Sequence, residues 1–220
     1  MKFLAVLTFA CWAGSVVAQT EAVPITQEPV HHLVLENEYT RVFYVEVPVG
    51  EQTLVHEHKN DYVFVTLGDS DVENMPQGKD PVRLQLKDGE VRYVKAPLVH
   101  RAKNLATTPF RNVTIEILKA GDAGEEKRAN LRIAASTVER ISNKKVTVVA
   151  YRAKAHGSID SDATTLPSLF VADSDLEITA RKAGRATLHS GDVKWLAVGT
   201  SFSVRGVGAQ PLRFAVLAYK

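Results

Sequence analysis

His56 and His58 are separated by one residue, a spacing at which two imidazoles can bind one metal ion. Residues i and i+2 of a strand point to the same face, so both imidazoles should project together. Leu54 shares that face, which predicts that it is the interior. His100 lies in a later strand-like segment, and a closed antiparallel barrel can bring two such strands face to face.

Three imidazoles that converge inside an apolar barrel would form a site for a divalent transition metal. Neutral imidazole suits Fe, Mn, Zn, Ni or Cu better than Mg or Ca. Cys11 is the only cysteine, and we expect it to be removed with a leader, so thiolate ligands and thiol catalysis are excluded. Taken alone, a His-x-His pair is often a polar pair on the wet face of a strand. His31 and His32 are adjacent and face opposite ways, so we interpret them as ordinary strand-entry residues.

The first 18 residues carry one Lys, then an apolar stretch, then Val16-x-Ala18. This is the pattern of a secretory signal peptide, and we expect cleavage after Ala18 and a secreted or periplasmic protein. The alternative is a lipoprotein acylated at Cys11, but the bulky Phe9 fits a lipobox poorly. No later segment approaches the roughly 20 apolar residues of a membrane span, so no membrane partner is expected.

The charge balance gives no case for nucleic-acid binding. The chain has 27 Lys and Arg against 25 Asp and Glu, for a net charge of +2. No basic run is interleaved with aromatic residues. The expected partner is therefore a small molecule, as substrate or ligand.

Short segments that alternate apolar and polar residues recur along most of the chain from His31 onward. Turn residues separate them every 8 to 12 residues or so, which is typical of an all-β sandwich or barrel. Residues 123–142 differ, because their apolar residues recur at helical spacing. There we expect a short helix or an irregular connector.

The second series of strands repeats the first. Residues 89–118 align without a gap on residues 191–220, at an offset of 102. A repeat of about this length predicts a domain duplication rather than a solenoid. The matched pairs include Gly89 with Gly191, Glu90 with Asp192, Tyr93 with Trp195, Pro109 with Pro211 and Arg111 with Arg213.

The first histidine segment resembles motif 1 of the cupin superfamily, G-x5-H-x-H followed by a Glu and then a Gly. Gly50, His56 and His58 hold this spacing, and Gly68 closes the motif. The resemblance implies a jelly-roll barrel in which His56 and His58 are metal ligands.

The second motif, G-x5-P-x-G-x2-H-x3-N, is matched by Gly89, His100 and Asn104, while Lys95 and Pro97 replace the family's Pro and Gly. The resemblance implies that His100 is the third ligand and Asn104 an orienting hydrogen-bond partner. It also implies a tendency to form homodimers through sheet contacts, which a duplicated chain could satisfy internally.

The family's Glu is missing, because the positions four and five residues after His58 hold Tyr62 and Val63. Asp61 is the nearest carboxylate. Strand alternation sends Asp61 outward and Tyr62 inward, unless a tighter turn resets the phase. Asp61 therefore remains open as a ligand, and Asp61 or Tyr62 is the candidate acid or base; the alternative for Tyr62 is a core residue.

The C-terminal copy has lost the site, because Phe202 and Gly206 stand where the first copy has His100 and Asn104. We expect a structural barrel that covers a sheet of the first. The predicted organisation is two tandem jelly-roll barrels: signal peptide 1–18, metal-binding barrel 28–120, connector 121–144 and degenerate barrel 145–220.

The resemblance implies a range of functions. The first hypothesis is an exported metal-dependent enzyme, of dioxygenase, decarboxylase, isomerase or lyase type, that acts on a small oxygen-rich substrate. The second is a non-catalytic barrel in which a metal anchors a carboxylate or sugar. The third is a storage or interaction protein with an empty barrel. One architecture serves unrelated chemistries, so the sequence does not name the substrate.

Overall fold

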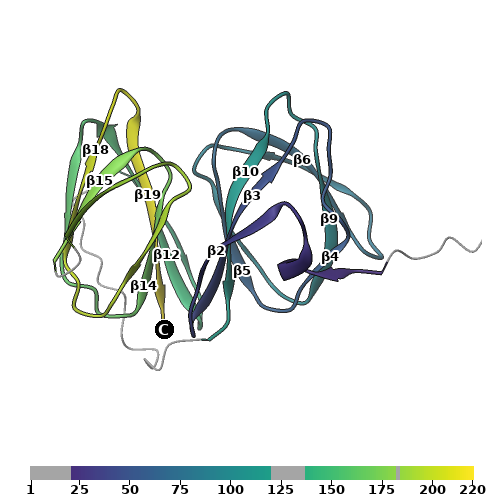
Figure 1. Ribbon diagram of the computed structural model, residues 1–220, viewed down its shortest axis with the longest axis horizontal. Coiled ribbons are helices and arrows are strands. Elements are labelled where there is room, and N and C mark those ends of the chain that lie inside the picture. Colours follow the sequence, from purple (N-terminus) through teal and green to yellow (C-terminus); the bar gives the residue numbers. More distant parts are fainter. Residues whose placement is uncertain (1–20, 120–136, 182–183) are drawn as a thin grey trace, which may run out of the picture.

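The computed structural model describes residues 21–119, 137–181 and 184–220. The predicted signal peptide of residues 1–18 lies outside these ranges, as does most of the predicted connector. Apart from one 3-10 helix, the regular structure of the described chain is β-strand, arranged as two barrels side by side (Figure 1). In the described part, no helix has the length and apolar character needed to cross a membrane.

The N-terminal barrel is built from two five-stranded sheets and carries one 3-10 helix, η1 (Ile25–Gln27). The outer sheet has the order β1 (Val23–Pro24), β4 (His56–His58), β9 (Leu98–Asn104), β6 (Ser70–Pro76) and β7 (Val82–Leu86). The inner sheet has the order β2 (His31–Glu36), β3 (Thr40–Val47), β10 (Phe110–Ile117), β5 (Tyr62–Thr66) and β8 (Val91–Val94).

The C-terminal barrel repeats this plan with a five-stranded inner sheet and a four-stranded outer sheet. The inner sheet has the order β11 (Thr137–Ser142), β12 (Val146–Ala155), β19 (Pro211–Tyr219), β14 (Ser168–Ala172) and β17 (Val193–Leu196). The outer sheet has the order β13 (Ser158–Ser161), β18 (Phe202–Gly206), β15 (Leu176–Ala180) and β16 (Gly184–Leu188).

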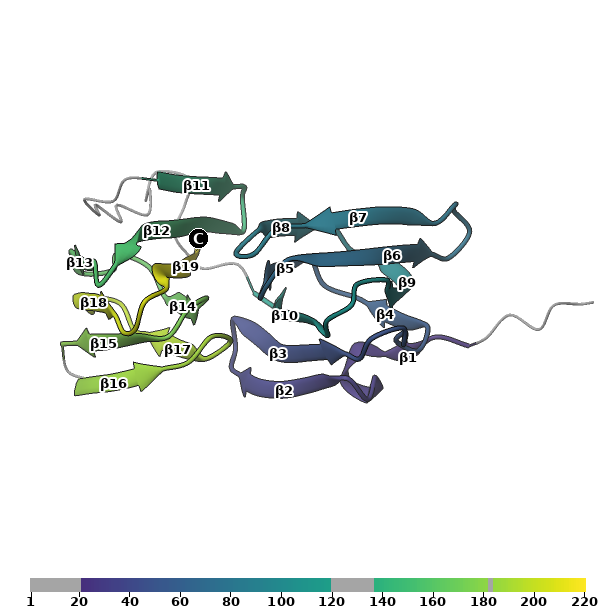
Figure 2. The same ribbon diagram turned by 90° about the horizontal axis from the view of Figure 1, so that it is seen from above.

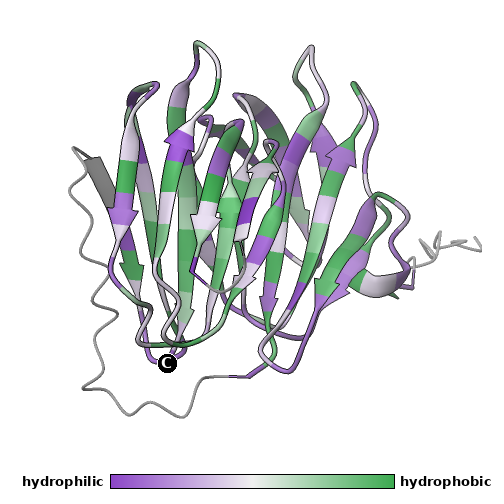
Figure 3. Ribbon diagram, turned by 60° about the vertical axis from the view of Figure 1, so that its left-hand side comes forward, coloured by the Kyte–Doolittle hydropathy of each residue, from purple (hydrophilic) through white to green (hydrophobic). Residues whose placement is uncertain are grey.

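Alternation along the strands places one set of side chains inside each barrel, and hydrophobic and hydrophilic positions succeed one another along many strands (Figure 3). Neighbouring residues of a strand point to opposite faces, so a strand buried on both faces carries two apolar sets. β10 shows this, since Phe110 belongs to the core of the first barrel while Val113 and Ile115 belong to the layer between the barrels.

The two inner sheets pack against each other and form the largest buried layer between the barrels (Figure 2). This confirms the expectation that the second copy covers a sheet of the first. Its first-barrel members include Val42, Val63, Val65, Val113 and Ile115, and its second-barrel members include Val146, Val148, Leu169, Leu217 and Tyr219.

The repeat found in the sequence is also a structural repeat. Adding 102 to the bounds of β8, β9 and β10 gives segments that contain most of β17, β18 and β19. Gly89 and Gly191, one from each copy, both have positive φ, at 77° and 96°. Each glycine lies against a side chain of the other barrel, Gly89 against Asp173 and Gly191 against Tyr44, so the duplicated turns pack reciprocally.

Two boundaries differ from the prediction. Residues before 28 belong to the first barrel, because Val23 pairs with His56 in parallel and Ile25 is buried in its core. Residues 137–142 form strand β11, paired with β12, rather than the end of a helix or connector. A helical spacing over so few residues is overridden when the main chain finds a sheet edge to join. The second barrel therefore begins before the predicted residue 145.

Candidate metal centre

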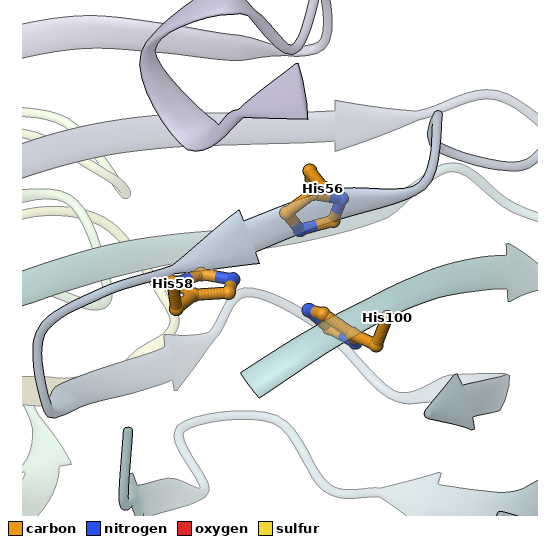
Figure 4. A group of neighbouring side chains, drawn as sticks. All are labelled: His56, His58 and His100. Carbon is orange, nitrogen blue, oxygen red and sulfur yellow. The ribbon is translucent and has the colours of Figure 1, made fainter. Parts of the chain in front are cut away.

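The outer sheet of the first barrel brings His56, His58 and His100 together. β4 pairs with β9 so that His56 lies directly opposite His100, and His58 follows two residues later on the same face. The ring centroids are 4.5 Å apart for His56 and His100, 5.1 Å for His56 and His58, and 5.2 Å for His58 and His100. The rings face a common space (Figure 4), and one nitrogen from each lies within 4.8 Å of the others.

Each of these imidazoles keeps one buried nitrogen without a hydrogen-bond partner: Nε2 of His56, Nδ1 of His58 and Nε2 of His100. The other nitrogen of His56 bonds the Leu54 carbonyl oxygen at 2.9 Å, and Nδ1 of His100 bonds Asn74 Oδ1 at 2.6 Å. Buried polar atoms are normally satisfied, since each orphan costs about 1–3 kcal/mol. A metal ion bound by the three orphan nitrogens would satisfy all of them, so the donor set fits such an ion.

The electrostatic environment keeps the three rings neutral. Burial lowers the pKa of His56 to about 4, helped by the nearby His31. Burial and then repulsion from neighbouring imidazoles lower the pKa of His58 to about 2 and that of His100 to about 3. At neutral pH all three are in the form that binds metals, and no proton must be removed first.

The three histidines line one side of a cavity of about 310 Å³ between the outer and inner sheets. Most of the other lining residues are apolar, such as Val45, Phe64 and Leu86. A concave apolar cavity with a few convergent polar groups is typical of a small-molecule site. Besides the histidines, its polar lining residues are Thr53, Tyr62, Asn74, Arg92, Tyr93, Asn112 and Thr114.

Tyr62 lies in this cavity, as alternation predicted. Its ring stacks on that of His58, with centroids 4.0 Å apart and an angle of 16° between the planes. Burial raises the pKa of the Tyr62 hydroxyl well above its usual value. Tyr62 therefore stays protonated and can act as a hydrogen-bond donor to a bound molecule.

Asp61, by contrast, is not brought to the histidines. Its carboxylate accepts hydrogen bonds from the Tyr93 hydroxyl at 2.6 Å and the Ala96 amide at 2.9 Å, and it pairs with Lys145 of the second barrel at 2.7 Å. Burial alone would raise the pKa of Asp61, but the bonds from Lys145 and Tyr93 lower it to about 2. The turn does not reset the strand phase, so Asp61 faces outward and joins the two barrels.

Two further expectations about neighbours of the site are corrected. Asn104 does not orient a group in the cavity: its amide nitrogen donates to the carbonyls of Val47, Pro48 and Thr108 and so holds the turn after β9. The orienting partner of His100 is Asn74, on β6. Leu54, which was expected inside with His56, is half exposed, because β4 begins only at His56.

Sequence reasoning missed His31 and Glu28. The His31 ring lies 4.9 Å from that of His56, and its Nδ1 bonds Glu28 Oε2 at 2.6 Å. Glu28 is buried, and its carboxylate also accepts the amides of Val30 and Leu54. Burial would raise the pKa of Glu28, but these bonds, led by that of His31, lower it overall. The available signal was the His31-His32 pair itself, because one of two adjacent strand residues must face inward.

Comparisons with solved structures identify the architecture. The chain is similar to a cupin 2 conserved barrel domain protein from Leptotrichia buccalis, with 9% identity and a TM-score of 0.53 over 86% of this chain and 87% of that one. It is also similar to the oxalate decarboxylase of Lactobacillus farciminis, with 10% identity and a TM-score of 0.61 over 86% and 84%.

A third similar structure is the salicylate 1,2-dioxygenase of Pseudoaminobacter salicylatoxidans, with 10% identity and a TM-score of 0.57 over 83% of this chain and 68% of that one. No protein-family model and no curated protein sequence matches the chain. This protein has a bicupin fold. The structural comparisons confirm the cupin resemblance at the level of the fold.

In this bicupin the second barrel has a filled interior. Phe202, at the position that matches His100, is buried and packs edge-on against Phe170 at 5.7 Å. Leu176, Ile178 and other apolar side chains complete that core. Among the described residues, the three-histidine group is found only in the first barrel.

Proposed function

We propose that this protein is an exported, metal-dependent cupin enzyme that acts on a small, oxygen-rich organic substrate. His56, His58 and His100 would hold a divalent transition metal such as Fe, Mn, Zn or Ni. The observation that carries the proposal is that the three rings turn their unpartnered, buried nitrogens toward one point at the wall of a cavity. Three protein ligands leave open coordination positions, which distinguish a catalytic site from a closed structural one.

The bound ion would supply Lewis acidity and a template for oxygen atoms of the substrate. The chain's own residues bind and enclose that substrate. The apolar walls of the cavity exclude water, and the Tyr62 hydroxyl offers a hydrogen bond to an oxygen held near His58. A cavity of about 310 Å³ is at the small end of ligand sites, which favours a compact substrate.

Two of the similar structures support this substrate class. One is a dioxygenase named for salicylate and the other a decarboxylase named for oxalate. Both compounds are small acids rich in oxygen. The identity to this chain is 10% in each case, so the reaction type is proposed only as dioxygenase, decarboxylase, isomerase or lyase.

A second candidate function is non-catalytic binding of a small ligand anchored by the metal. One observation favours it: among the described residues that line the cavity there is no Asp or Glu. A carboxylate that could transfer protons, as Asp61 was expected to do, is therefore missing from the walls. An enzyme of this design must rely on the ion, the imidazoles and Tyr62.

A turnover assay separates the two functions. The metal-loaded protein is incubated with a panel of diketones, catechols, keto acids and hydroxy acids, and oxygen consumption and products are followed. The matched control is His100→Ala, which removes one ligand. We expect turnover of at least one class by the unaltered protein and none by the variant. Tight binding without turnover of any bound compound would favour the binding function instead.

A further inference from the structure

A carboxylate and imidazole pair, Glu28 and His31, lies beside the candidate metal site. The side chains are almost fully buried, with 1% and 5% of their surfaces exposed. His31 lines the same cavity as the three candidate ligands, but it comes from β2 of the inner sheet. Its ring packs edge-on against Phe43 at 5.9 Å and lies 4.9 Å from the ring of His56.

The pair is built to fix the direction of the His31 ring. Glu28 Oε2 accepts the Val30 amide and bonds His31 Nδ1, while Oε1 accepts the Leu54 amide. An ionised carboxylate only accepts hydrogen bonds, so the Nδ1 proton points to Glu28, and Nε2 is the ring nitrogen left to bond a molecule in the cavity. His56 and His100 follow the same pattern, with Nδ1 bonded to an oxygen and Nε2 directed to the site.

His31 nevertheless lies outside the ligand set. The group of nitrogens within 4.8 Å of one another contains His56, His58 and His100 but not His31. The ring of His31 is 6.4 Å from that of His58, farther than any distance among the three. His31 is therefore adjacent to the candidate metal position and faces the cavity in which a ligand of the metal would lie.

We propose that His31, oriented by Glu28, binds the substrate: its Nε2 accepts a hydrogen bond from a hydroxyl of the molecule held at the open positions of the metal. This inference rests on the proposed metal site and narrows its substrate class. The ligand carries a hydroxyl or enol next to a metal-binding oxygen, as in catechols, enols of diketones and α-hydroxy acids. If the role of the pair were purely structural, a carboxylate and an imidazole would be buried only to hold the start of β2. Both groups are costly to remove from water, which favours a role in binding.

The test uses the full chain loaded with Co²⁺ and two probes. 4-Nitrocatechol has a second hydroxyl next to its metal-binding oxygen. Oxalate at neutral pH has no hydroxyl group, and its affinity is measured by its competition with 4-nitrocatechol. The variants are His31→Ala, His31→Phe, which keeps a ring against Phe43, and Glu28→Gln. His32→Ala is the matched control, because His32 is the exposed neighbour on the opposite face.

We expect His31→Ala and His31→Phe to weaken 4-nitrocatechol binding about tenfold, the loss of one buried hydrogen bond between neutral groups. In both His31 variants, the affinities for Co²⁺ and for oxalate should stay within about threefold of those of the unaltered protein. Glu28→Gln should also weaken 4-nitrocatechol binding. His32→Ala should leave all three affinities unchanged. A loss of Co²⁺ affinity comparable to that of His100→Ala would make His31 a ligand and overturn the inference. Unchanged binding of 4-nitrocatechol would also overturn it. If the unaltered protein bound no Co²⁺, the proposed function itself would fail.

Discussion

At the scale of single residues, the three buried histidines lower the stability of the metal-free protein in acid. The pKa values of His56, His58 and His100 are about 4, 2 and 3 when folded, against about 6.5 in an unfolded chain. Below pH 6.5 the unfolded chain binds up to three more protons, so stability is lost as the pH falls from 6.5 toward 4. The three histidines alone give a slope of up to about 4 kcal/mol per pH unit. Asp173 opposes it by about 1 kcal/mol per pH unit, because burial raises the pKa of its carboxyl to about 7 and the folded chain takes up that proton first.

Urea unfolding of the metal-free protein between pH 7.5 and 5 measures this slope. His58→Ala removes one of the three protons, so its slope should be shallower by about 1.4 kcal/mol per pH unit. A variant with the same slope as the unaltered protein would show that His58 is not held neutral by burial.

The position of Asp61 gives a second residue-level prediction. Asp61→Asn removes the charge that pairs with Lys145 and weakens the bond from Tyr93. We expect the free energy of unfolding at pH 7 to fall by about 1–2 kcal/mol, because the partly exposed ion pair with Lys145 is lost and the bonds from Tyr93 and Ala96 go to a neutral acceptor. The metal content should not change. Asp69→Asn is the control, because its exposed carboxylate bonds only Lys87 and the Asp88 amide, and an asparagine oxygen still accepts from that amide. Loss of metal in Asp61→Asn would place Asp61 back in the site.

The sequence correctly predicted the direction of a side chain where that direction depends on strand alternation alone. It places His56, His58 and Tyr62 inward and Asp61 outward, as the structure has them. It failed at His31, because the orientation of that ring depends on Glu28 and on a second sheet. No spacing of residues along the sequence indicates which side chains of two different sheets will be in contact.

At the scale of elements, β9 presents His100 at one end of its span and stops at Asn104. The Asn104 amide nitrogen bonds three carbonyls, and its Oδ1 accepts the Ala106 amide at 2.9 Å. We expect Asn104→Ala to lower the free energy of unfolding by about 2–4 kcal/mol, because several buried polar groups lose their partner. The folded variant should still bind metal with unchanged stoichiometry. Thermal unfolding with and without metal measures both effects, and an unaltered stability would contradict this role.

Most strands were predictable because they are half buried and therefore alternate. β1 and β11 were not, for a physical reason. β1 has two residues and exists through its parallel pairing with β4, and β11 exists through its pairing with β12. Segments that are ordered by a partner strand rather than by their own pattern do not show the alternation of a half-buried strand.

At the scale of the whole molecule, the duplicated turns at Gly89 and Gly191 each pack against the other barrel. A Cβ on Gly191 would lie 2.9 Å from Tyr44 Cε2 and 3.1 Å from Leu67 Cδ1, and φ is 96° there. Gly199 has a φ of 80° but open space around it. We expect Gly199→Ala to cost about 1–2 kcal/mol from backbone strain alone. Gly191→Ala should cost at least about 1 kcal/mol more, because it also crowds the layer between the barrels.

Chemical unfolding of the two glycine variants makes this comparison. Equal costs would mean that the barrels are not tightly packed at this turn. The offset of 102 residues predicted two barrels, and the inner sheets do pack within one chain. The shape of the cavity was not predictable, because it depends on the registers of both sheets at once.

The proposed function depends on imidazoles 56, 58 and 100 holding one metal ion. Elemental analysis of the purified protein, before and after replacement of His56 and His58 by Ala, tests it most directly. We predict close to one transition-metal ion per chain in the unaltered protein, and loss of that ion in the double variant while circular dichroism shows the β fold retained. Absence of metal from the unaltered protein, even after incubation with Fe, Mn, Zn or Ni, would contradict the account.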